Sequence, residues 1–317
     1  MSLPSRQTNF FISASELSMH PLVSIIIPTH RASHFKTALM CALGQTYAHI
    51  EIIVSDNSSN SEISEICSRY PQIIYRKNTD GKPASNISLP IALATGDYIK
   101  YLFDDDLIYP NCIDSMIGWL EKFSPENIAK IGLITSARHL VNDESICYSE
   151  IREPDINTTS IIDGLQLAKR ILITQDNFIG EFSTIMFRRD LVDCQNPLSI
   201  FSIFNEDFSY GLIDVPLYID LLQKSSLLYI PYSLSAFRKH AEGGSNVAAN
   251  PGFHYVVSDW FRLTRGAYAA GLLNEHEAKV SATNYLNLST LFDDVFFDPL
   301  TPWRNEASEF QAARTAI

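Results

Sequence analysis

The sequence contains neither a run of 18 apolar residues nor a pair of cysteines with CxxC spacing. The lack of a long apolar run argues against a membrane-spanning helix. The cysteines are odd in number and widely spaced, which argues against a disulfide framework or a zinc site; they are Cys41, Cys67, Cys112, Cys147 and Cys194. Polar residues interrupt the first 20 residues, so no secretory signal is predicted. We therefore expect a cytoplasmic protein, and a peripheral contact with the inner face of a membrane stays open.

Basic residues are also scarce, with 24 Lys and Arg against 36 Asp and Glu, and the formal net charge is −12. A chain of this charge has no general attraction to nucleic acid, so nucleic acid is not an expected partner. A small anionic ligand would need local cations. With 317 residues, of which 46% are hydrophobic, the chain is able to bury a large core.

The first 125 residues alternate between short apolar runs and segments of helical periodicity. Strands are predicted at 22–27, 50–54, 72–76 and 98–103, and helices between them at 34–45, 61–70 and 84–94. This order predicts an α/β fold with a mainly parallel sheet flanked by helices. Further along, we expect a strand at 182–187, a helix at 214–223 and a strand at 227–230. Helices at 255–271 and 274–292 and a weaker helical tail form a C-terminal helical extension.

Polar residues follow three of these strands, at 29–31, 55–57 and 104–106. Parallel sheets bind ligands beyond the carboxyl ends of their strands, so the three groups should meet at one edge. The last group is Asp104, Asp105 and Asp106. Clustered carboxylates suit a hard divalent cation such as Mg²⁺ or Mn²⁺ that is shared with substrate phosphates. The alternative, a solvated acidic turn, is less favoured because the other two groups converge on the same edge.

Four stretches of the sequence resemble family 2 glycosyltransferases: 23–30, 42–47, 51–59, and 96–106 followed by Pro110. The resemblance is dense over 22–125, fainter over 180–189 and 214–240, and absent beyond 247. It implies a GT-A fold that binds a nucleotide-diphosphate sugar. On this basis we expect an N-terminal extension at 1–20, a nucleotide-sugar-binding half at 21–125, an acceptor-binding half at 126–246 and a C-terminal helical region at 247–317.

The resemblance places Pro28, Thr29 and His30 against the base and ribose of the donor. It implies that Asp56 accepts a hydrogen bond from the base and that Asn86 contacts ribose or phosphate. From the residues alone, Asp56 in Asp-Asn-Ser-Ser is more often a turn or cap residue, and only the resemblance reverses that preference. UDP is the first expectation for the nucleotide, from the habit of the family.

The acidic cluster resembles the DXD-type motif of the family, which holds a divalent metal against the diphosphate. Phe103 stands where the first acid of that motif is common, which is a departure. The resemblance leaves Asp105 as the metal ligand, with Asp104 toward ribose or metal-bound water. His240 resembles a position near the metal, and imidazole is a competent ligand for Mn²⁺. A divalent metal, Mn²⁺ or Mg²⁺, is therefore the expected cofactor.

An inverting transfer needs a base that takes the proton from the acceptor hydroxyl. We expect Asp214 in this role, although an Asp that opens a helix is equally suited to cap it. Asp207, in an acidic pair just before it, is the rival. Glu181 and the pair Arg188 and Arg189 would lie near the acceptor pocket if the fainter resemblance holds.

The sequence thus predicts a metal-dependent inverting glycosyltransferase that acts on a saccharide or lipid-linked hydroxyl, in bacterial surface polysaccharide synthesis. The alternatives are a non-catalytic sugar-nucleotide-binding protein and a sugar-1-phosphate nucleotidyltransferase. The latter would need a Gly-rich phosphate loop after the first strand, and this chain has none there. The C-terminal helices are expected either to close over the acceptor side or to form a homodimer.

Overall fold

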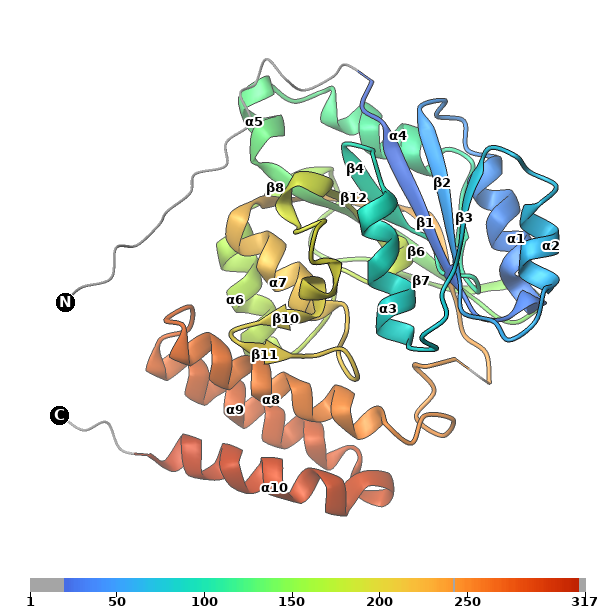
Figure 1. Ribbon diagram of the computed structural model, residues 1–317. Helices are drawn as coiled ribbons and strands as arrows, with labels where there is room; N and C mark the ends of the chain where they lie inside the picture. Colours follow the sequence, from blue (N-terminus) through green and yellow to red (C-terminus); the bar gives the residue numbers. More distant parts are fainter. Residues whose placement is uncertain (1–19, 242, 314–317) are drawn as a thin grey trace.

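The computed structural model describes residues 20–241 and 243–313. Most of the expected N-terminal extension, residues 1–19, lies outside this range. In the described part, ten strands form one sheet along the order β3-β2-β1-β4-β9-β6-β12-β5, with β7 beside β6 and β8 beside β12. Helices cover both faces, and a layer of further helices follows at the C-terminal end (Figure 1). This is the mainly parallel α/β architecture that the sequence predicts.

The first half of the sheet is parallel and forms from the β-branched runs. It contains β1 (Val23–Thr29), β2 (Ile50–Asp56), β3 (Ile73–Lys77) and β4 (Tyr98–Tyr101). Every residue of β1 is buried, as expected of a strand covered on both faces. The connecting helices are α1 (Ala32–Leu43), α2 (Glu62–Cys67) and α3 (Pro83–Ser88). The expected helix at 84–94 is wrong in its second half, where Pro90 lacks an N–H donor and a 3₁₀ turn, η1 (Leu89–Leu93), takes over.

The second half of the sheet is mixed in direction. The long strands β6 (Ile131–Val141) and β12 (Ser226–Arg238) are parallel to each other. The shorter β5 (Leu107–Ile108), β7 (Cys147–Ile151) and β8 (Ser160–Ile162) pair with them in antiparallel fashion.

The strand β9 (Met186–Arg188) runs antiparallel between β4 and β6 and so joins the two halves of the sheet. The strand expected at 182–187 is therefore shorter, because residues 182–184 form the 3₁₀ turn η2 (Phe182–Thr184).

The remaining elements complete the layers. On the sheet lie α4 (Cys112–Leu120), α5 (Pro125–Lys130), α6 (Gly164–Thr174) and α7 (Val215–Lys224). Two 3₁₀ turns, η3 (Arg189–Leu191) and η4 (Pro197–Phe201), lead to the small hairpin of β10 (Ser202–Ile203) and β11 (Glu206–Asp207). The C-terminal layer is α8 (Phe253–Ala269), α9 (Glu275–Thr290) and α10 (Asp293–Ala312).

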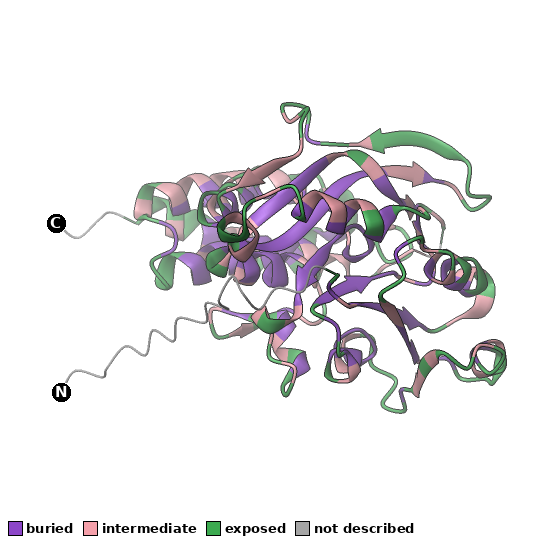
Figure 2. Cartoon of the chain, turned by 90° about the horizontal axis from the view of Figure 1, so that it is seen from above, coloured by how far each residue is buried: buried purple, intermediate pink, exposed green. Residues whose placement is uncertain are grey.

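Buried apolar side chains pack on both faces of the sheet, and Figure 2 shows most strands as the buried centre of the molecule, with the exposed β7 at its periphery. Along β1, Val23, Ile25 and Ile27 face α1 and α4, whereas Ile26 faces the core shared with α6 and α7. This second core continues without a break into α8 and α9, so the C-terminal helices belong to the same folded body. Within the described residues, no helix has the length and apolar character needed to cross a membrane.

Candidate active site

The carboxyl ends of β1 and β4 meet at the acidic cluster. The side chain of Asp104 accepts a hydrogen bond from Thr29 Oγ1 at 2.8 Å and another from the backbone N–H of His30 at 3.2 Å. Burial, helped by the neighbouring Asp105 carboxylate, raises the pKa of Asp104. Thr29 is buried, whereas the His30 side chain is 61% exposed. The structure thus brings these predicted donor residues together, and their direct contact with a donor stays a prediction.

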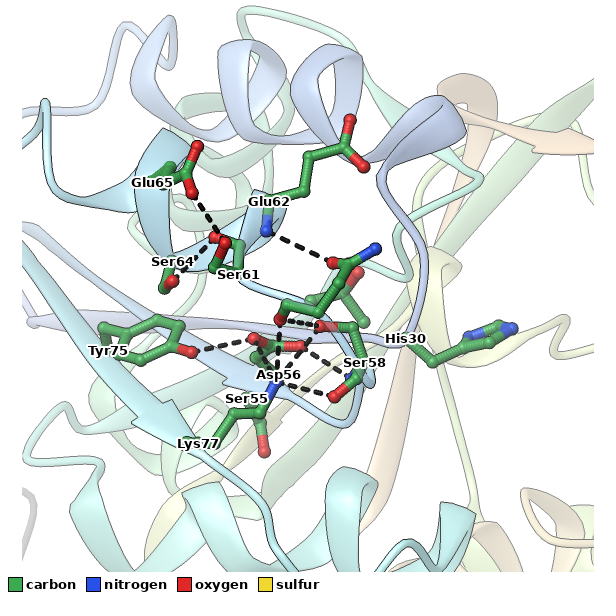
Figure 3. A network of polar contacts seen from close by, with 12 residues as sticks. His30, Ser55, Asp56, Ser58, Ser61, Glu62, Ser64, Glu65, Tyr75 and Lys77 are labelled. Carbon is green, nitrogen blue, oxygen red and sulfur yellow. Dashed lines mark hydrogen bonds and ion pairs between the residues drawn. The ribbon is translucent and has the colours of Figure 1, made fainter.

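Asp56 lies at the neighbouring end of β2, in register with Thr29 and with Lys77 of β3. Its side chain is fully buried and accepts hydrogen bonds from Tyr75 Oη at 2.7 Å, Lys77 Nζ at 3.0 Å and the backbone N–H of Ser58 at 2.7 Å (Figure 3). Burial works to raise the pKa of Asp56, but the hydrogen bonds from these residues outweigh it and lower the pKa. The hydrogen bond from Ser58 is the predicted turn chemistry, and the hydrogen bonds from Tyr75 and Lys77 hold the carboxylate in place as an acceptor. Lys77 is not among the residues that the sequence predicts here, although it directly follows the strand predicted at 72–76 and ends β3 in the structure.

Asn86, on α3, holds the ends of two strands together. Its amide Nδ2 donates to the carbonyl of Thr29 at 3.0 Å, and its Oδ1 accepts from Ser55 Oγ at 2.8 Å. The residue is buried. In this arrangement Asn86 fixes the backbone next to the expected ribose position, and its expected contact with ribose or phosphate stays a prediction.

The predicted metal ligands Asp105 and His240 lie side by side although 135 residues separate them. His240 Nε2 is 3.0 Å from Asp105 Oδ2. Arg238, at the end of β12, holds the two segments together, because its backbone N–H donates to Asp106 Oδ1 at 3.0 Å and its Nε donates to the carbonyl of Asp105 at 2.7 Å. Asp106 is buried, which raises its pKa well above the ordinary value. By accepting the hydrogen bond from the backbone of Arg238, Asp106 fixes the end of β12 beside the acidic cluster.

The pair has the spacing that a divalent cation requires. Two ligands at adjacent corners of an octahedron, each about 2.1 Å from the metal, lie about 3 Å apart. Asp105 Oδ2 and His240 Nε2 are 3.0 Å apart, and the Asp105 side chain is 21% exposed. No group of three or more His, Cys, Asp or Glu side chains arranged for a metal is found among residues 20–241 and 243–313. The residues fit an ion that takes its other ligands from water and a diphosphate, as Mg²⁺ commonly does.

A cavity of about 1110 Å³ opens beside this pair and extends toward the second half of the chain. Asp105, Asp106 and Lys82 of the donor side line it, and so do Glu181 and Asp214 from the second half of the chain. Residues of the C-terminal layer, Phe253 and Val256, also reach it. The cavity therefore connects the predicted donor side with the predicted base.

Asp214 caps α7 and also faces the cavity. Its Oδ1 accepts from the backbone N–H of Val215 at 2.9 Å, and its Oδ2 accepts from Asn177 Nδ2 at 2.7 Å. Burial raises the pKa of Asp214 to about 6, and the negative charge of Glu181 acts in the same direction. A carboxylate with this pKa is ionised at neutral pH and is a stronger base than an exposed one. Nothing in the sequence pointed to Asn177, because its partner lies 37 residues away.

The rival base occupies a different setting. Asp207 is exposed and accepts from the N–H of Ser209 at 3.0 Å and from its hydroxyl at 2.9 Å. It lines the same cavity. Its neighbour Glu206 is tied to Arg262 and Arg265 of α8, both at 2.9 Å.

Of the residues expected near the acceptor pocket, Glu181 lies there and the arginine pair does not. Glu181 lines the cavity and forms an ion pair of 2.6 Å with Arg138 of β6. Arg188 pairs with Tyr98 at the amino end of β4, and the backbone of Arg189 is hydrogen-bonded to Asp97 there. The expectation for Arg188 and Arg189 is wrong, because the antiparallel direction of β9 carries them to the opposite edge of the sheet.

Comparison with known proteins agrees with this architecture. The family model described as glycosyl transferase family 2 matches residues 24–192. An uncharacterized glycosyltransferase of Rickettsia typhi is 37% identical over 110 residues, which cover 34% of this chain and 35% of that protein. Glycosyltransferase GlyG of Streptococcus pneumoniae is 28% identical over 107 residues, 31% of this chain and 35% of that protein. The chain thus matches about a third of the length of these curated relatives.

Solved structures match over nearly the whole chain. TarS of S. aureus, residues 1–349 in complex with UDP-GlcNAc, has a TM-score of 0.62 at 15% identity, covering 91% of this chain and 80% of that one. The mannosyltransferase PcManGT of Pyrobaculum calidifontis, in complex with GDP-Man and Mn²⁺, has a TM-score of 0.51 at 13% identity, covering 92% and 85%. These likenesses show the GT-A fold. Because the family model covers more than half of the sequence, the chain belongs to glycosyl transferase family 2.

Proposed function

We propose that this chain is a metal-dependent, inverting glycosyltransferase that moves a sugar from a nucleotide-diphosphate donor, first UDP, to a hydroxyl of a saccharide or lipid-linked acceptor. The observation that carries the proposal is that a single cavity is lined both by Asp105, which pairs with His240, and by Asp214. The UDP-GlcNAc complex of TarS and the GDP-Man and Mn²⁺ complex of PcManGT support a nucleotide sugar and a divalent ion.

In this proposal each side of the cavity has its own task. Asp105 and His240 hold the divalent ion, which would stabilise the negative charge that develops on the departing diphosphate. Thr29, Asp104 and Asn86 keep the strand ends in place around the donor, and Asp56 receives the base. Residues 21–125 then form the donor half and 126–246 the acceptor half, and the C-terminal helices α8, α9 and α10 close the acceptor side; residues 314–317 of the expected C-terminal region lie outside the described residues.

Asp214 is the proposed base. Its ionised carboxylate takes the proton from the acceptor hydroxyl as that oxygen attacks the sugar from the face opposite the diphosphate. Asn177 holds one carboxylate oxygen in place by its hydrogen bond, which directs the carboxylate within the cavity. The exposed Asp207 is the less suitable base because it lacks the buried setting that makes Asp214 a stronger base.

Calorimetric titration of UDP, GDP and dTDP, with and without Mn²⁺, tests the donor side. One nucleotide should bind in a metal-dependent way, and Asp105→Ala should lose the metal-dependent part. Asp298→Ala is the matched control because Asp298 is exposed on α10. Failure of all three nucleotides to bind would refute the donor site, and equal loss in both variants would refute the role of Asp105. We further propose that the protein acts in surface polysaccharide synthesis and lies in the cytoplasm. Peripheral contact with a membrane and a homodimer are further options.

A further inference from the structure

Arg31 reaches the two proposed metal ligands from the opposite end of the chain. It precedes α1 in extended conformation. Its Nη2 lies 3.2 Å from His240 Nε2 and 3.8 Å from Asp105 Oδ2. The side chain of His240 is 4% exposed, whereas that of Arg31 is 23% exposed. A guanidinium nitrogen therefore contacts the same two atoms that are spaced for a divalent ion.

The hydrogen-bonding capacity of the imidazole makes this contact informative. A ring nitrogen either carries a proton and donates or carries a lone pair and accepts. His240 Nε2 must donate to bond the Asp105 carboxylate, but it must accept to bond Arg31, which only donates. If Nε2 accepts from Arg31, its lone pair and the Asp105 oxygen lie 3.0 Å apart without a proton between them. Such an arrangement is stable when a cation bridges both atoms, and the Arg31 guanidinium is placed to do so.

We propose that Arg31 is an internal counter-cation of the Asp105 and His240 pair, and that a divalent ion must displace it to bind. The proposal rests on the metal site of the proposed function and adds a residue that sets the affinity of that site. Since Arg31 is partly exposed, its side chain has solvent to turn into when the ion arrives. The free enzyme then binds divalent ions more weakly than its two ligands alone would allow.

The test is a Mn²⁺ titration of the nucleotide-free protein, followed by the loss of the free-ion signal in electron paramagnetic resonance. Arg31→Gln removes the competing charge and should bind Mn²⁺ at least about fivefold more tightly, which corresponds to two unit charges ~4 Å apart in water. Arg31→Lys keeps a positive charge and should stay closer to the natural protein. Arg69→Gln is the control, because Arg69 is exposed just after α2. Asp105→Ala should remove the binding.

The outcomes separate this inference from the proposed function. If Asp105→Ala removes binding but Arg31→Gln binds no more tightly than the natural protein, the counter-cation is refuted and the metal site stands. If Asp105→Ala binds Mn²⁺ as well as the natural protein, the metal site is elsewhere and both proposals fall. Should Arg31→Gln not fold, the Nε–H resonance of Arg31 in the natural protein decides: it should shift on saturation with Mg²⁺, and an unmoved resonance refutes the displacement.

Discussion

The substitution Asp214→Asn should make the enzyme slower and, at neutral pH, more stable. Asp214 is ionised at neutral pH in a buried setting where burial raises its pKa to about 6, against about 3.9 for an exposed aspartate. The folded state therefore holds the proton more tightly than the unfolded chain. The contribution of the protonated Asp214 to the free energy of unfolding is complete below about pH 4 and is lost as the pH rises through about 6.

The size of the effect follows from the pKa difference. About two pKa units correspond to about 3 kcal/mol of unfolding free energy, which the natural protein loses between pH 4 and pH 8. Asn cannot ionise and avoids this loss. It keeps one oxygen for the N–H of Val215 but presents an amide NH₂ to Asn177, which costs about 1 kcal/mol. Asp214→Asn should thus gain about 2 kcal/mol at pH 8 and lose about 1 kcal/mol at pH 4.

Urea unfolding of both proteins at pH 4, 6 and 8 measures the difference directly, with the exposed Asp298→Asn as control. Turnover should fall by about 10²–10⁴ in Asp214→Asn, the usual worth of a general base, while nucleotide affinity stays the same. In the natural enzyme, turnover should rise with pH through about 6, as the base ionises. If the two proteins differ in stability by the same amount at pH 4 and pH 8, the raised pKa of Asp214 is refuted. Unchanged turnover would refute Asp214 as the general base and favour Asp207.

Two further substitutions probe the surroundings of the cavity. Lys77→Met should lower the free energy of unfolding by about 1–3 kcal/mol, because the fully buried carboxylate of Asp56 loses its cation. Urea unfolding measures this loss, with Lys36→Met as the control because Lys36 is exposed. Equal stability of the two variants would contradict the prediction. Gly211→Ala would place a Cβ 2.1 Å from a carboxylate oxygen of α8 and should cost about 1–3 kcal/mol in thermal or urea unfolding. Gly118→Ala, in the open on α4, should instead be neutral or stabilising, so a similar loss in both variants would show that the contact with α8 is unimportant.

The sequence predicts the parallel half of the sheet well because each of its strands is marked by an apolar pattern within its own few residues. The run Val23–Thr29 carries its own apolar pattern, and parallel strands present their carboxyl ends at one edge whatever the loops do. That is why Thr29, Asp56 and Asp104 were placed together correctly from residue pattern alone.

The second half was harder because its structure depends on distant contacts. A strand of three residues such as β9 has too little pattern to reveal its direction, so the sequence does not correct the expectation, drawn from the fainter resemblance, that Arg188 lies near the acceptor pocket. The contacts of Arg31 with His240 and of Asn177 with Asp214 span 209 and 37 residues. The periodicity of a sequence predicts only contacts between near neighbours, so it does not predict these pairs. His240 is expected at the site only because of the family resemblance.

The position of β9 has a mechanical consequence. Among the described strands, β9 is what connects the parallel half of the sheet to β6, and it contributes three residues to that joint. The sheet is therefore held across its middle by few ladder hydrogen bonds, while each half is internally well paired. Phe187 of β9 packs in one buried core and Met186 in the other, so side-chain packing, more than ladder hydrogen bonds, holds the two halves together. The family match covers 24–192 and so includes β4, β9 and β6, the three strands that meet at this seam.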